Sequence, residues 1–324
     1  MNVSFARKVK RYEKQAQKVK KLTNFETYIA LIKGYCVLSV LLVPKAFSNG
    51  GWGISAIFMV MSGGLSCLAC LKLVDVGLQL NLYSYPLAVE KALGRKARVF
   101  IDVAISLTQF CFVISHVTFL ISASKNSVDS LSGWDTSVAL YGGIVLMVYT
   151  LLSWVRNLAA FSFTFLIGTV LIIISCIFVM GKAGVMFFDG SAVPGEVPFI
   201  NSSGVMNTLG FTIYAFEGIG IVMPVLATCE NPQDFKSMVT YAYITLVVVF
   251  IVFAEVCVFA WGTTLQPYVT ENLNSASTLV ILIKFAYSLN LVCSYPMAIY
   301  PTNITIENWF CSCLQRSPKS LYWA

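Results

Sequence analysis

Charged side chains are scarce in this sequence: Asp, Glu, Lys and Arg make up only 11% of its 324 residues. A soluble domain has about 25% charged residues, so this chain has too few to cover a water-facing surface. Hydrophobic residues make up 57% of the chain, and the mean hydropathy is +0.77. The apolar runs are long and unbroken, which excludes a soluble fold and predicts an all-α polytopic membrane protein.

Histidine is almost absent, since His116 is the single one and lies within an apolar run. A Ser-His-Asp triad would have to place this imidazole in lipid, and the chain carries no nucleotide-binding loop and no H-E-x-x-H motif. Most of the ten cysteines also lie inside apolar runs, which does not suit a zinc site. The sequence therefore predicts a protein that is not an enzyme and needs no metal or organic cofactor; an intramembrane enzyme is the minor alternative.

The net charge of +7 does not predict nucleic-acid binding, because the basic residues are concentrated at the N-terminus, outside any apolar run. Residues 5–22 place apolar side chains at helical spacing among lysines, which suits a helix on an anionic membrane surface. A solvated basic tail is the open alternative. The expected partner of this segment is the lipid bilayer, with no nucleic acid.

Eight apolar runs are long enough to be predicted as membrane spans. They cover residues 29–48, 53–75, 98–123, 137–154, 157–181, 204–228, 239–262 and 277–300. With the N-terminus in the cytoplasm, only Lys125 and Lys182 among the basic residues outside the spans lie on the opposite side, as the positive-inside rule requires. The outer loop then contains Asn201, a glycosylation candidate in an Asn-Ser-Ser motif. A plasma, vacuolar or lysosomal membrane is favoured over a mitochondrial one.

Two of these spans are predicted to be interrupted. The first contains Gly34 and Pro44, and the sixth contains Glu217 and Gly218, followed by Pro224. Interrupted helices in corresponding positions indicate a transporter site near the middle of the membrane. The backbone groups freed at each break need a cavity, a substrate or an ion rather than lipid. A pair of tolerated kinks is the alternative interpretation.

Polar side chains inside spans are candidates for coupling transport to an ion. Glu217 is the leading one, because a carboxylate in a span can gain and lose a proton; its alternative role is to hold the broken backbone through local amides. His116 is expected more as an interhelical hydrogen-bond partner than as a proton relay. Lys33 and Lys45 are expected to extend to the membrane surface as anchors.

Three stretches of the chain carry a family resemblance. The most specific stretch is AFEGIGIVMP at 215–224, followed by ENPQDF at 230–235. The second consists of KG at 33–34, VPKAF at 43–47 and GGW at 50–52. The third runs from TQF at 108–110 to FL at 119–120. They resemble the sixth, first and third spans of the amino acid/auxin permease family, especially its proton-coupled amino acid transporter branch. The resemblance covers about residues 27 to 310.

This resemblance implies a leucine-transporter-type inverted-repeat fold, in which an amino acid binds at the breaks of spans 1 and 6. By position, the substrate-binding residues would be Gly34, Val37, Ser39, Phe216, Glu217, Gly218 and Ile219. The family usually has glycine where this chain has Val37 and Ser39, and often tyrosine at His116. The implied function is proton-coupled amino acid symport. Sodium is the runner-up ion, with Ser294 on span 8 as a possible oxygen ligand.

The resemblance also predicts the organisation of the chain. It divides into a basic cytoplasmic segment (1–28), a first five-helix repeat (29–181), an extracytoplasmic loop (182–203), the first three spans of a second repeat (204–300) and a cytoplasmic tail leading to absent further spans (301–324). The fold is thus expected to be C-terminally incomplete, as a fragment, as a truncated product or as a chain whose missing helices come from a partner. A non-transporting sensor or structural membrane subunit derived from an amino acid permease is the alternative function.

Overall fold

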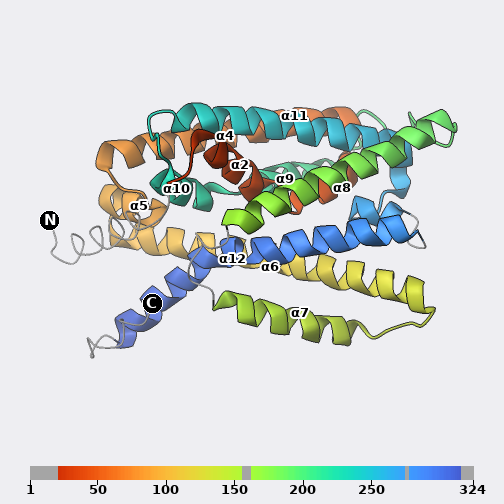
Figure 1. Ribbon diagram of the computed structural model, residues 1–324. Coiled ribbons are helices and arrows are strands. Elements are labelled where there is room, and N and C mark those ends of the chain that lie inside the picture. The colour runs from red at the N-terminus through yellow and green to blue at the C-terminus, as the bar shows by residue number, and fades with distance from the viewer. Residues whose placement is uncertain (1–20, 155–161, 274–276, 315–324) are drawn as a thin grey trace.

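The computed structural model describes residues 21–154, 162–273 and 277–314, and within these ranges the regular structure is helical apart from one isolated β-bridge. The prediction of an all-α protein is confirmed. The α-helices are α2 (Asn24–Tyr35), α3 (Ser39–Gly50), α4 (Trp52–Leu80), α5 (Tyr85–Leu93), α6 (Arg95–Ser132), α7 (Val138–Ser153), α8 (Ser162–Phe188), α9 (Val205–Ala215), α10 (Ile219–Thr228), α11 (Phe235–Trp261) and α12 (Thr278–Leu314). Two 3-10 turns, η2 (Gly262–Thr264) and η3 (Val269–Asn272), separate α11 from α12. The long helices α4, α6, α8, α11 and α12 extend alongside one another (Figure 1).

The described residues contain six helices or continuous helix pairs that are long and apolar enough to cross a membrane. A seventh span is formed if α2 and α3, which meet at 48°, are taken together. Helix α7, at the predicted fourth span (137–154), is apolar but has only 16 residues, so that span, and with it the total of eight, stays a prediction. The chain is thus a multi-span membrane protein. The relation of its halves as inverted repeats also stays a prediction.

The first span begins at Asn24, earlier than residue 29 where the apolar run was predicted to begin. The reason is a capping box: the Glu26 N–H donates to the Thr23 hydroxyl at 3.3 Å, and the Thr23 N–H donates to the Glu26 carboxylate at 2.9 Å. This pairing satisfies two N–H groups at the helix start and so extends the helix into a polar stretch. The basic segment at residues 1–20 lies outside the described residues.

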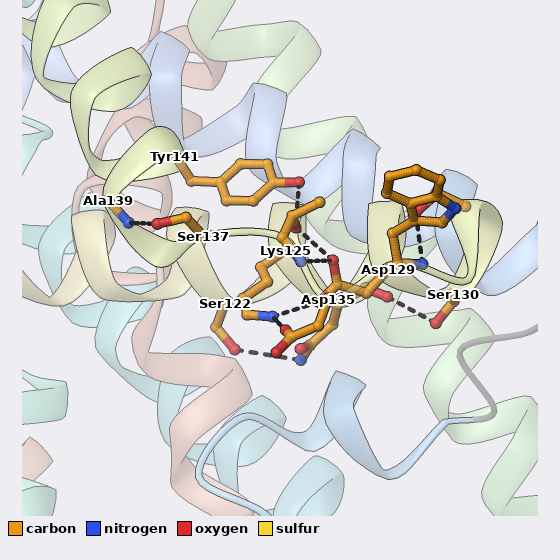
Figure 2. A network of polar contacts seen from close by, with 12 residues as sticks. Ser122, Lys125, Asp129, Ser130, Asp135, Ser137, Ala139 and Tyr141 are labelled. Atoms are coloured by element: carbon orange, nitrogen blue, oxygen red, sulfur yellow. Dashed lines mark hydrogen bonds and ion pairs between the residues drawn. The ribbon is translucent and has the colours of Figure 1, made fainter.

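A network of polar contacts closes the turn between α6 and α7 (Figure 2). The Lys125 ammonium forms ion pairs with Asp129 and Asp135. Asp129 also accepts a hydrogen bond from the Thr136 N–H at 3.0 Å, and the Thr136 hydroxyl lies 3.0 Å from that of Tyr141. These contacts fix one end of the bundle, called here the Asp135 end. Helix α5 lies at the opposite end, called the α5 end (Figure 1).

Candidate functional site: two paired broken spans

The first break separates α2 from α3 at residues 36–38, between Gly34 and Pro44 rather than at either of them. Gly34 is in the last turn of α2, and Pro44 lies inside α3. The Val37 carbonyl accepts a hydrogen bond from the Tyr287 hydroxyl of α12. The Ser39 hydroxyl donates to the carbonyl of the fourth residue before it at 2.9 Å. Two of the carbonyls at this break are therefore satisfied by protein side chains, as a membrane interior requires.

The second break lies where the sequence predicted it, with Phe216, Glu217 and Gly218 between α9 and α10. The Glu217 N–H donates to the Tyr214 carbonyl at 3.1 Å, which finishes α9. Within the described residues the half-buried Glu217 carboxylate makes no hydrogen bond or ion pair. It therefore does not hold the broken backbone through local amides, which was the alternative role. Its charge lies within electrostatic range of Cys70 on α4 and Tyr85 on α5.

The two broken spans pack closely at the Asp135 end, where α9 begins against the end of α3. A Cβ atom added to Gly204 would lie 1.9 Å from the Asn49 carbonyl oxygen. The Thr208 hydroxyl donates to the Ala46 carbonyl at 2.7 Å. The Asn201 side-chain amide donates to the Asn49 carbonyl at 2.8 Å, so a glycan there, which stays a prediction, would require this amide to turn away.

The two breaks themselves are in contact. A Cβ atom added to Gly218 would lie 2.4 Å from the ring of Tyr35, so the ring packs directly on the glycine. Tyr243 of α11 donates from its hydroxyl to the Tyr35 hydroxyl at 2.9 Å, and Cys70 Sγ lies 3.1 Å from the Tyr243 hydroxyl. The Phe216 ring stacks on the Tyr243 ring with centroids 5.8 Å apart. An aromatic cluster thus holds the second break against α2.

The pairing continues to the α5 end of the bundle. The Leu22 N–H donates to the Thr228 carbonyl at 2.8 Å, and the Glu230 N–H donates to the Leu22 carbonyl at 2.9 Å. The Asn24 side-chain amide donates to the Asp234 carboxylate at 3.2 Å. The two broken spans therefore touch at both ends and at their breaks, which makes them one structural unit.

An open pocket of about 430 Å³ lies on the Asp135 side of both breaks. It is lined by Leu42, Ser115, Asn207, Gly210, Phe211, Tyr214 and Tyr268. The pocket adjoins Tyr214, two residues before the second break, and the Tyr268 hydroxyl lies 2.9 Å from Thr118 Oγ1 at its edge. A pocket of this volume is in the range that small molecules occupy.

The prediction that Lys33 anchors the membrane surface is wrong. Its side chain is only 1% exposed, and its ammonium donates to Asn290 Oδ1 on α12. The short α2 turns residue 33 into the bundle, where Gly168 of α8 leaves room for it: an added Cβ atom there would lie 2.5 Å from Lys33 Nζ. Lys45, also predicted as an anchor, is half-buried in α3.

The two other coupling candidates lie near this lysine. His116 of α6 is 2% exposed, lies within range of the Lys33 charge, and its Nδ1 has no hydrogen-bond partner among the described residues. The Ser294 hydroxyl donates to the Asn290 carbonyl at 2.7 Å and lies 3.4 Å from Asn290 Oδ1. The structure therefore brings three helices and the first broken span together around one buried ammonium.

Sequence reasoning missed the residues that join the breaks to their neighbours, namely Tyr35, Gly168, Tyr243, Tyr287 and Asn290. Only Asn290 carries a signal, because an amide in the middle of an apolar run marks a polar contact inside a bundle. Of the predicted substrate residues, Val37, Phe216 and Gly218 contact other elements of the site. Gly34 and Ile219 are half-buried beside the breaks.

Two broken spans packed side by side in a helical membrane bundle define the class of protein, since this arrangement is typical of secondary transporters. The chain belongs to the family of transmembrane amino acid transporter proteins, whose model matches residues 20–322. The family consists of transporters rather than enzymes.

Curated relatives agree with this family. The chain is 24% identical to vacuolar amino acid transporter 3 and 26% identical to vacuolar amino acid transporter 4 of Saccharomyces cerevisiae, over 89% and 88% of its own length. It spans less than half of these two relatives, 42% and 40% of their lengths. It is also 22% identical to amino acid transporter AVT1I of Arabidopsis thaliana, over 92% of this chain and 74% of that protein.

Proposed function

We propose that the protein carries amino acids across a vacuolar membrane by proton-coupled symport, with the substrate held at the paired breaks. The observation that carries the proposal is the contact of the two broken spans at Tyr35 and Gly218, beside the Glu217 carboxylate, which has no hydrogen-bond or ion-pair partner in the described part of the chain. The vacuolar membrane is proposed because relatives from yeast are vacuolar amino acid transporters.

The breaks offer complementary charges to a zwitterion. Helices α3 and α10 begin at the breaks, and a helix N-terminus carries a partial positive charge that suits the carboxylate of an amino acid. Helices α2 and α9 end there, so their last carbonyls suit the ammonium group. Both ends of an amino acid backbone therefore have a matching partner, whatever the side chain.

The coupling proposal is tested by replacing Glu217 with glutamine. Uptake of a mixture of radiolabelled amino acids into proteoliposomes containing the full natural protein is expected to rise when the side of entry is acidified, because a proton enters with the substrate. Glu217→Gln is expected to remove this stimulation, because the amide cannot take up the proton. Glu255→Gln is the matched comparison, since Glu255 is a half-buried carboxylate of the unbroken α11, and it is expected to respond to the gradient as the unaltered protein does.

Three outcomes would contradict parts of the proposal. Uptake that follows a sodium gradient and ignores pH contradicts proton coupling. A Glu217→Gln variant that still responds to the pH gradient contradicts the role of Glu217. Binding of amino acids without any uptake contradicts transport and supports the sensor alternative.

A further inference from the structure

The Lys33 ammonium is a buried charge inside the first broken span. Charged side chains inside a span cost about 2.5–3.5 kcal/mol on insertion scales and are retained where they have a function. Lys33 is 1% exposed, and no carboxylate among the described residues forms an ion pair with it. Its contact is the neutral amide oxygen of Asn290, a residue that is itself fully buried.

The space around this ammonium is narrow and lined by polar side chains of α12. Gly168 of α8 faces it, and a Cβ atom there would lie 2.5 Å from both Lys33 Nζ and Asn290 Oδ1. Asn290 Nδ2 has no hydrogen-bond partner among the described residues. The side-chain contacts of this buried amide are therefore made by its oxygen, which accepts from Lys33. The Ser294 hydroxyl lies 3.4 Å from the same oxygen.

The titratable groups that face Lys33 carry no formal negative charge in their ordinary forms. They are Cys36 of its own broken span, Cys293 of α12 and His116 of α6. The residue of α8 that lies against the Lys33 ammonium is Gly168, which has no titratable side chain. The ammonium is therefore the cationic centre of a neutral, oxygen-containing site between the first break, α8 and α12.

We propose that the Lys33 ammonium is a tethered cation, which occupies the position between the first break and α12 where a coupling sodium ion would otherwise bind. Ser294 was expected as a possible oxygen ligand for sodium, and the structure places a protein ammonium beside it. The ammonium holds α2 against α8 and α12 without an external ion. The consequence for coupling, that sodium has no role, rests on the proposed function.

Thermal unfolding of the full natural protein in detergent tests the tethered cation without measuring transport. Lys33→Ala removes the ammonium and leaves space for an ion, whereas Lys33→Met removes the charge but fills the space. Both variants are expected to melt on the order of 5 °C below the unaltered protein. Methylammonium or sodium chloride, compared with choline chloride at equal ionic strength, is expected to raise the melting temperature of Lys33→Ala and not that of Lys33→Met. Equal responses of the two variants would overturn the proposal.

A second pair of variants decides the question if Lys33→Ala does not fold. Gly168→Ala keeps the charge but pushes a methyl group against the ammonium, so its melting temperature is expected to fall. Gly181→Ala, on the same helix with no atom within 4 Å of the added Cβ, is expected to melt as the unaltered protein does. A Gly168→Ala variant as stable as Gly181→Ala would overturn the proposal, as would sodium-dependent uptake by the unaltered protein. The predicted melting pattern without any amino acid uptake would instead contradict the proposed function and leave the tethered cation intact.

Discussion

Replacing Gly218 with alanine is expected to reduce amino acid uptake roughly 100-fold, since a misplacement of about 1 Å in a site can cost this much. The added Cβ atom would lie 2.4 Å from the Tyr35 ring, so the two breaks would have to move apart. The φ of Gly218 is 179°, outside the left-handed region that favours glycine. The loss is therefore attributed to the contact between the breaks. Uptake of radiolabelled amino acids at matched protein levels measures it.

Gly220→Ala is the matched control for this prediction. Gly220 is two residues further along, inside α10, and an added Cβ atom would meet its nearest neighbour, Ile105, at an ordinary 3.5 Å. We expect this variant to transport at close to the unaltered rate. If Gly218→Ala transports as well as Gly220→Ala does, the close contact of the breaks is not needed for transport.

The second large effect is expected on stability, from Gly204→Ala at the Asp135 end. The added Cβ atom would lie 1.9 Å from the backbone oxygen of Asn49, and a backbone atom cannot rotate away as a side chain can. Overpacking of this kind costs about 1–3 kcal/mol, and separation of α9 from α3 would also strain the hydrogen bond between Thr208 and Ala46. The melting temperature of the purified protein is therefore expected to fall.

Gly210→Ala tests whether this effect comes from the contact. Gly210 lies inside α9, the helix that Gly204 precedes, and nothing approaches within 4 Å of an added Cβ atom. Alanine favours a helix over glycine by about 1 kcal/mol, so this variant is expected to melt at or above the unaltered protein. Equal melting of the two variants would show that α3 and α9 are not as closely packed as the structure has them.

The second break could be read directly from the sequence, whereas the first could not be placed. A glutamate and two glycines within one apolar run mark the point where α9 ends and α10 begins. The first break lies at residues 36–38, which are ordinary helix formers or apolar residues without Gly or Pro. There the Val37 carbonyl accepts a hydrogen bond from Tyr287, a residue far along the chain. Such a partner is invisible in a local pattern.

The helical membrane class and the approximate spans follow from the chain alone, because transfer of a segment into lipid is close to a sum over its own residues. The position of Lys33 does not follow from the chain in this way. Its flexible stem allows it to reach either the membrane surface or the interior, and the choice depends on Gly168 and Asn290 arriving from other helices. The contact of Tyr35 with Gly218 has the same origin. Local composition sets which segments enter the membrane, and packing between distant segments sets which side chains meet there.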